Sequence, residues 1–184
     1  MDLIKAIQER RSVRKFKDKA PNWRRIIECI DLMRYAPMAG NNFALKFILV
    51  TDPEKIKKIT LATQQGFVSQ AKYILVVCSN PSRAINEFGE DGKIWNKQQV
   101  GAAIETFLLS LLDKGLSTCW IGYFVKDQVK KTLRIPEDIE VEALFPIGYS
   151  FEKSKNKTQR IELDRVLYFD TYGNKQMKTL RQAH

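Results

Sequence analysis

The N-terminal segment holds the first residues whose types and spacing suit a ligand. Arg10, Arg11 and Arg14 surround the hydroxyl of Ser12, between two stretches of helical character. Guanidinium groups bind phosphate through paired, charge-assisted hydrogen bonds, a geometry that lysine does not offer. The cluster therefore suits a phosphate. A basic turn at a helix end, favoured by the helix dipole, explains the same residues equally well.

Two further segments could approach a ligand through their backbone. Residues 37–42, Pro-Met-Ala-Gly-Asn-Asn, combine small residues with amide side chains that donate and accept hydrogen bonds. Residues 118–122, Thr-Cys-Trp-Ile-Gly, have the composition of a strand ending in glycine, which allows close approach to the main chain. Taken singly, the first segment is more often an ordinary turn and the second an ordinary strand.

The remaining composition removes several kinds of chemistry. The one histidine is His184, so a Ser-His-Asp triad, a Cys-His pair and a histidine-rich metal site are not expected. Cys29, Cys78 and Cys119 stand in apolar surroundings without zinc-ligand spacing, and we expect them to be reduced core residues. The sequence therefore predicts no metal site and no catalytic side-chain constellation.

The net charge of +10 is concentrated at the chain ends. Residues 1–35 hold ten basic and five acidic residues, and residues 151–184 hold eight and four. Such surfaces attract nucleic acid, anionic lipid or phosphorylated small molecules, although a solvated lysine-rich surface is the plainer explanation. A basic nucleic-acid-binding module stays open as an alternative and would need aromatic residues interleaved with the cations.

The hydrophobic pattern predicts alternating helices and strands. Helices are expected over residues 3–9, 22–36, 54–64, 100–114 and 125–133, and strands over 46–51, 73–78, 116–122, 141–149 and 165–169. Residues 80–92 are predicted to be an irregular loop, and Pro146 to mark a strand end or a sheet edge. The helix over 100–114 is apolar on nearly every face, so we expect its own sheet and a partner subunit to cover it.

This pattern indicates one α/β or α+β domain over residues 1–170, followed by a polar tail over 171–184. No apolar run reaches the roughly 20 residues that cross a bilayer. The N-terminus lacks the apolar core of a signal peptide, so a cytoplasmic location is expected.

Five motifs stand in a fixed order along residues 3–168: Arg10-Arg-Ser-Val-Arg14, Ala36-Pro-Met-Ala-Gly-Asn41, Gly101 through Gly122, Leu144-Phe-Pro-Ile-Gly-Tyr149 and Arg160-Ile-Glu-Leu-Asp164. Together they resemble the FMN-dependent nitroreductase family. The resemblance implies an α+β nitroreductase-like fold with a central, mostly antiparallel sheet flanked by helices, a long buried central helix and an intertwined homodimer. It also implies FMN as cofactor and NAD(P)H as co-substrate. Hydride would pass through flavin N5 to a nitroaromatic, a quinone or a similar small acceptor by a two-step (ping-pong) mechanism. Because the flavin carries this chemistry, no catalytic side chain is required.

The resemblance also assigns cofactor-binding residues. Arg10, Arg11 and Ser12 would bind the FMN phosphate together with Arg160, and Arg14 would lie near the ribityl chain or the pyrimidine edge. The remaining assignments are the backbone of Trp120, Ile121 and Gly122 along the N5 side of the ring, an amide contact from Gln65, and contacts to the partner subunit's FMN from Pro37, Met38, Ala39 and Asn41.

Three departures from the family pattern concern the acceptor side of the site. Met38 replaces the usual Ser, Ile161 replaces a Pro, and Phe43-Ala-Leu45 stands where Gln-Pro-Trp is usual. A specialised flavin reaction such as reductive dehalogenation therefore stays open as an alternative, as does a protein that binds FMN without turnover.

Overall fold

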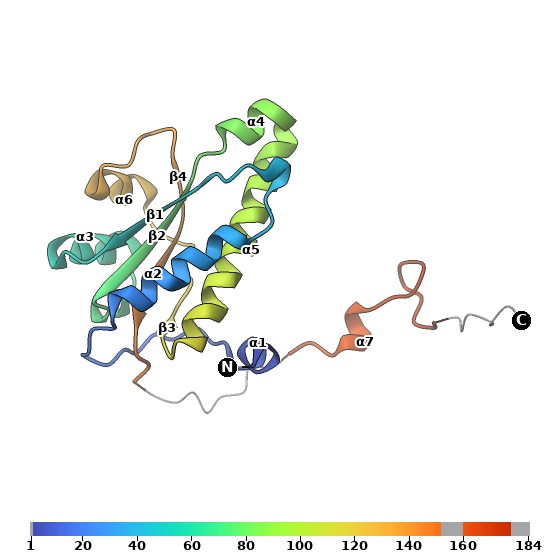
Figure 1. Cartoon of the computed structure of the whole chain (residues 1–184), viewed down its shortest axis with the longest axis horizontal. Coiled ribbons are helices and arrows are strands. Elements are labelled where there is room, and N and C mark those ends of the chain that lie inside the picture. Colours follow the sequence, from blue (N-terminus) through green and yellow to red (C-terminus); the bar gives the residue numbers. More distant parts are fainter. Residues whose placement is uncertain (1, 152–159, 178–184) are drawn as a thin grey trace, which may run out of the picture. The chain divides into compact units, whose positions relative to one another are not determined.

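The computed structural model describes residues 2–151 and 160–177 (Figure 1). Residue contacts divide the chain into two compact units, Met1–Lys153 and Ser154–His184. The expected single domain over residues 1–170 and tail over 171–184 stay predictions. Within the described residues, no helix has both the length and the apolar character needed to span a bilayer.

The first unit is built on an antiparallel sheet. Its strands stand in the order β1-β2-β4-β3, and each described pairing is antiparallel. The strand bounds are β1 Leu45–Val50, β2 Tyr73–Ser79, β3 Ser117–Thr118 and β4 Glu140–Gly148. The expected antiparallel sheet is confirmed.

Six α-helices and three short 3-10 helices surround the sheet in the described part of the first unit. The α-helices are α1 Leu3–Glu9, α2 Trp23–Leu32, α3 Pro53–Thr63, α4 Ser82–Phe88, α5 Glu90–Asp113 and α6 Lys126–Leu133. The 3-10 helices are η1 Met33–Tyr35, η2 Ala39–Asn41 and η3 Gly66–Gln70. The side chains of Asp2, Asn22 and Asp52 accept hydrogen bonds from the first turns of α1, α2 and α3, which explains where these helices begin.

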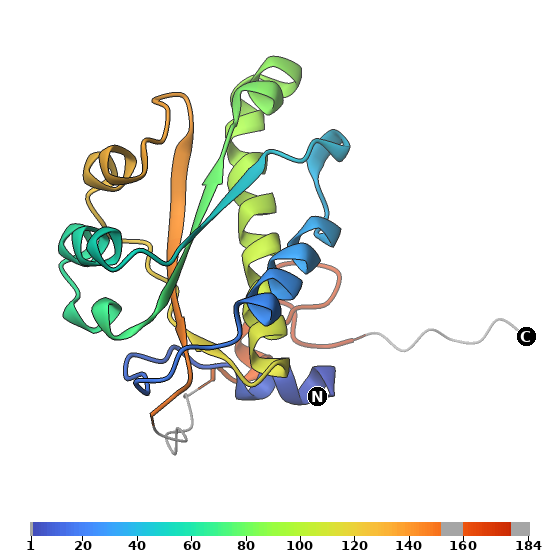
Figure 2. The same cartoon turned by 60° about the vertical axis from the view of Figure 1, so that its left-hand side comes forward.

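Helices lie on both faces of the sheet (Figure 2), and each face carries its own core. Because side chains alternate along β2, Leu75 and Val77 pack with α2 and α5, whereas Ile74 and Val76 pack with α3 and α6. The rings of Phe107 on α5 and Phe145 on β4 lie 5.6 Å apart, edge to face, in the first core. The long helix α5 is therefore buried against the sheet, as expected.

The three cysteines are free and buried, which confirms their prediction as reduced core residues. Burial raises the pKa of the Cys78 thiol to about 11 and also raises the pKa of Cys29. Both thiols therefore stay protonated at neutral pH, and neither is a nucleophile.

The prediction of a loop over residues 80–92 is wrong. Helix α4 occupies Ser82–Phe88, and α5 begins at Glu90, ten residues before the expected start. Gly89 joins the two helices at a φ of 60°, a conformation that favours glycine. A Cβ on Gly92 would overlap the backbone of Ala84, so this glycine permits the close packing of α4 on α5. The apparent helix breakers are thus the residues that let two helices follow each other directly.

Two strand predictions also need correction. Pro146 lies inside β4, which is flanked by β2 and β3. The carbonyl of Pro146 accepts a hydrogen bond from the Thr118 hydroxyl, so it points toward β3. The N–H position of a strand residue lies on the same side as its carbonyl, so the N–H that proline lacks is not needed for the pairing of β4 with β2. In the second unit, residues 165–169 are not a strand, because the helix α7 covers Leu163–Val166.

Candidate functional site

Residues 10–17, here called the N-terminal strap, connect α1 to the edge of the sheet. The backbone N–H of Val13 donates to the carbonyl of Thr118 on β3 at 2.9 Å. Phe16 then forms an antiparallel bridge with Ser150, just beyond β4. The structure therefore brings the Arg10–Arg14 segment to the strand that precedes Trp120 and Gly122.

Two further contacts hold the strap in place. The N–H of Phe16 donates to the side-chain carbonyl of Gln70 at 3.1 Å. The ring of Phe16 is buried and lies directly over Gly148, where an added Cβ would come within 2.8 Å of it. Sequence reasoning missed Gln70, the last residue of η3, since a single glutamine carries no signal of such a long-range contact.

The arginines of the strap keep donors available for an anion. Arg10 contacts the carboxylate of Glu105 on α5 through Nε, at 3.3 Å, which leaves its terminal nitrogens unused by that contact. Arg11 donates to the carbonyls of Gln8 and Arg10. Arg14 is exposed and forms no ion pair with any described residue. Three guanidinium groups lie within five residues, and Arg10 alone of the three pairs with a carboxylate of the described residues, so this edge of the sheet is cationic.

The chain after β3 presents unpaired backbone donors next to the strap. Ile121 is bridged to Leu144 of β4, and both its N–H and its carbonyl are used there. Backbone groups alternate in direction along an extended chain, so those of Trp120 and Gly122 face away from β4. Their N–H groups form no hydrogen bond with any described residue. Gly122 also has no atom near the position of a Cβ, so its backbone is open to a ligand.

The loop over Pro37–Asn41 turns through two left-handed residues and is tied to α5. Gly40 and Asn41 both have positive φ, at 57° and 51°. Met38 packs against the first core, which accounts for a thioether in this loop, and Ala39 is tied by its N–H to Gln99 on α5. The next residue, Asn42, is buried, and its side-chain N–H₂ has no partner among the described residues.

Within one chain this loop does not meet the N-terminal strap. Gly40 lies against Glu87, just before α5 begins, and Ala39 reaches Gln99 in the first half of α5. Arg10 instead pairs with Glu105, six residues or about 9 Å further along the helix. The loop and the strap therefore contact different halves of α5.

Two predicted residues remain, Gln65 and Arg160. Gln65 immediately precedes η3 without a side-chain capping bond, and it follows Ala62, whose carbonyl accepts a hydrogen bond from the N–H of Val125, by three residues. It thus lies near the segment that follows Gly122. Arg160 is an exposed residue of the second unit, so its predicted phosphate contact stays a prediction. Among the described residues, no group of His, Cys, Asp or Glu side chains is placed to hold a metal ion.

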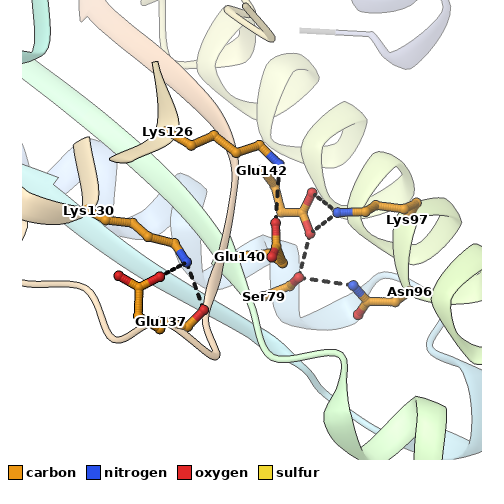
Figure 3. A network of polar contacts seen from close by, with 8 residues as sticks. All are labelled: Ser79, Asn96, Lys97, Lys126, Lys130, Glu137, Glu140 and Glu142. Atoms are coloured by element: carbon orange, nitrogen blue, oxygen red, sulfur yellow. Dashed lines mark hydrogen bonds and ion pairs between the residues drawn. The ribbon is translucent and has the colours of Figure 1, made fainter. Parts of the chain in front are cut away.

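A polar network between the sheet and α5 was not expected from the sequence (Figure 3). The carboxylate of Glu142 accepts hydrogen bonds from Ser79 on β2 and from Lys97 on α5. At the edge of this network, a hydrogen bond from Lys126 lowers the pKa of Glu140. One feature of the sequence could have indicated this network: Asn96 is a polar residue at a position that continues the buried stripe of α5 at helical spacing.

Comparison with known proteins assigns the arrangement to one family. The nitroreductase family matches the chain over residues 7–67 and 59–149. A protein of Archaeoglobus fulgidus, named for NADH dehydrogenase/NAD(P)H nitroreductase activity, is 31% identical over 153 residues, which cover 80% of this chain and 85% of that protein. An FMN reductase [NAD(P)H] of Bacillus subtilis is 25% identical over 188 residues, and the match covers 94% of this chain and 75% of that protein.

Solved structures share the fold. NfrA2 of B. megaterium superposes with a TM-score of 0.83 at 24% identity, over 94% of this chain and 76% of that one. An FMN-dependent nitroreductase from Clostridium difficile gives 0.79 at 22% identity, over 92% and 99%. The fold is therefore that of a nitroreductase-like α+β oxidoreductase. The chain belongs to the nitroreductase family, and the predicted membership is confirmed.

Proposed function

We propose that this protein binds FMN at the junction of the N-terminal strap and β3 and uses it to pass electrons from NAD(P)H to a nitroaromatic, a quinone or a similar small acceptor. The observation that carries the proposal is the Val13–Thr118 hydrogen bond of 2.9 Å. It places a cluster of arginines beside a strand edge with unpaired N–H groups. Relatives named as an NAD(P)H nitroreductase and an FMN reductase support this reading.

The residues present fit the two ends of an FMN molecule. The terminal nitrogens of Arg10 and the exposed side chain of Ser12 supply donors for a phosphate. The outward N–H groups of Trp120 and Gly122 supply donors for the edge of a planar ring that carries nitrogen and oxygen acceptors. Arg11 and Arg160 would complete the phosphate site, and Gln65 would add an amide contact.

When bound, FMN supplies the hydride and electron chemistry, and the protein's own residues bind and orient the reactants. A cation next to the ring favours an anionic reduced state, which is the part that Arg14 would play. The exposed ring of Trp120 packs near the buried Phe145, with centroids 5.9 Å apart, and so fixes the strand that carries the donors. No described side chain has to move a proton in this scheme.

The active form is proposed to be a homodimer in which Pro37, Met38, Ala39 and Asn41 reach the partner subunit's FMN. The loop and the strap contact different halves of α5 in one chain, which supports a site completed by a second copy. Large apolar side chains are also exposed on α1 and α5, among them Ile4, Ile7 and Ile94. Light scattering after gel filtration tests the oligomer, and a monomer with full FMN affinity refutes the shared site.

Flavin binding and reduction test the function directly. Purified protein should be yellow or take up FMN stoichiometrically, and anaerobic NADH or NADPH should bleach the flavin band. The double variant Arg10→Ala/Arg160→Ala should lose FMN, whereas Arg25→Ala/Arg83→Ala removes the same charge from exposed helix positions and should retain it. Equal FMN affinity in both double variants shows that the phosphate lies elsewhere.

A panel of acceptors separates the reactions open to this family. An iodotyrosine deiodinase of Thermotoga neapolitana is 23% identical over 90% of this chain and 96% of that protein, which keeps reductive dehalogenation as the second candidate. Steady-state oxidation of NADH and NADPH should be measured with a nitroaromatic, a quinone and a halogenated phenol. Turnover with the halogenated phenol alone favours the second candidate, and no turnover with any of them indicates FMN binding without catalysis.

A further inference from the structure

A continuous chain of hydrogen bonds runs from the sheet to the loop over Pro37–Asn41. The N–H of Ala39 donates to Oε1 of Gln99 at 3.1 Å, and Nε2 of Gln99 donates to Oδ1 of Asn96 at 3.2 Å. Nδ2 of Asn96 donates to Oγ of Ser79 at 2.9 Å, and that hydroxyl donates to the Glu142 carboxylate at 2.5 Å. Four consecutive bonds thus connect a loop amide to a charged group.

All four bonds point the same way, from the loop toward the carboxylate. An ionised carboxylate only accepts, so the Ser79 hydroxyl has to donate to Glu142 and accept from Asn96. The Asn96 amide then presents its oxygen to Gln99, and the Gln99 amide presents its own oxygen to Ala39. The charge at one end therefore fixes the orientation of both amides and leaves a single acceptor facing the loop.

The middle of this hydrogen-bond chain is shielded from water. Ser79 and Asn96 are fully buried, and Gln99 is 5% exposed. In such surroundings an unmade hydrogen bond leaves a donor or acceptor unsatisfied, which costs about 1–3 kcal/mol. An alternative orientation of either amide would set two acceptors or two donors against each other, so the network has one stable arrangement.

A β-bulge places the Glu142 side chain on the α5 side of the sheet, where the hydrogen-bond chain lies. Val77 pairs with Ala143 and Cys78 with Val141, so Glu142 is the extra residue on β4. Regular alternation would direct Glu142 to the α3 and α6 side, whereas the bulge turns it toward α5. There Lys97 donates to both carboxylate oxygens, at 2.7 and 2.8 Å, and balances the charge.

We propose that Gln99 is a positioning residue that holds the loop over Pro37–Asn41 in its flavin-contacting shape through this oriented chain, anchored on Glu142. The inference rests on the proposed function, because it assigns the loop's flavin contact to a side chain that does not itself touch the flavin. Gly40 and Asn41 follow Ala39 in left-handed conformations, of which only that of Asn41 is less favoured than a right-handed one. The bond from Ala39 to Gln99 ties the start of this turn to α5.

Hydrogen exchange in the flavin-free protein tests the hydrogen-bond chain itself. Amide hydrogen exchange at Ala39, followed by NMR, should be slow in the natural sequence and about 10-fold faster in Gln99→Leu, which keeps the size of the side chain but removes the acceptor. Glu142→Gln should also speed exchange at Ala39, by about 3-fold, although it lies four hydrogen bonds away. Gln98→Leu, an adjacent exposed glutamine on the same helix, is the matched control and should leave the rate unchanged. Unchanged exchange at Ala39 in Gln99→Leu overturns the proposal.

Measurements of FMN binding distinguish a failure of this proposal from a failure of the proposed function. Gln99→Leu should weaken FMN binding about 10-fold, while Gln99→Glu, which retains the acceptor for Ala39 but cannot donate to Asn96 when ionised, should weaken it less. Faster exchange at Ala39 with unaltered FMN affinity means that the chain is structural only, which overturns the positioning role. A natural sequence that takes up no FMN refutes the proposed function, and it is recognised before any variant is made.

Discussion

Replacing Gly148 by alanine should loosen the N-terminal strap, and with it the arginine cluster. The added Cβ would lie 2.8 Å from Cδ1 of Phe16 and 3.2 Å from its Cγ. Ordinary contacts between carbon atoms are about 3.5–4.0 Å, so the ring has to move or the strap has to lift from β4. Overpacking of this kind costs about 1–3 kcal/mol.

The assay is a double-mutant cycle with Phe16→Leu, read as the free energy of unfolding in urea. Phe16→Leu removes the ring atoms that the new methyl group would meet, and alone it should cost about 1–2 kcal/mol through lost burial. The two changes together should cost less than their sum, by about 1–2 kcal/mol. Gly66→Ala is the matched control, because no atom lies within 4 Å of its added Cβ.

Displacement of the strap by Gly148→Ala should also affect FMN binding. Gly148→Ala should weaken FMN binding more than its loss of stability alone would require, because the strap carries Arg10 to Arg14. An unfolding free energy within about 0.3 kcal/mol of the natural sequence refutes the contact between Gly148 and Phe16. Additive costs in the double variant refute it as well.

Two further changes test electrostatic and polar features. Lys126→Gln removes the 3.1 Å hydrogen bond that lowers the pKa of Glu140, and it should cost about 0.2–1 kcal/mol at about pH 7. Because that pKa is lowered in the folded state, the bond stabilises the protein above the ordinary value of 4.5, and the cost should shrink as the pH falls below that value through the lowered pKa. Urea unfolding at neutral pH and at a series of pH values below 4.5 checks this, and a cost that does not change with pH contradicts it. Asn42→Leu removes a buried amide whose N–H₂ lacks a partner among the described residues, so it should stabilise the flavin-free protein by about 1–3 kcal/mol. A lower melting temperature would show that the amide is satisfied.

Local signals predicted most of the fold. The predicted starts of α1, α2 and α3 lie within one residue of the observed ones, because each helix begins after a side-chain acceptor, Asp2, Asn22 or Asp52, which is a short-range requirement. Local reasoning failed over residues 80–92, which were expected to form a loop. Gly89 and Gly92 serve the junction of α4 and α5 instead, and whether a glycine breaks or joins helices depends on what packs beside it.

The candidate site was predictable as a set of segments but not as an arrangement. The types of residue in the Arg10–Arg14 cluster indicated a phosphate, yet nothing in the sequence pairs Val13 with Thr118. The polar chain through Asn96 and Gln99 was likewise hidden, because its anchor depends on the bulge at Glu142, a register shift between two strands. Such long-range geometry follows from the whole sheet rather than from any one window of sequence.

The strap has a consequence for the order in which the molecule matures. Val13 pairs with Thr118, and Phe16 with Ser150, so each contact spans more than 100 residues. During synthesis the arginines leave the ribosome first, but their partners on the sheet leave near the end of the first unit. Contacts of such long range form late, because their loop entropy is offset only once the sheet exists. The cationic cluster should therefore be the last part of the site to assemble, and a truncated chain that lacks β4 should not retain flavin.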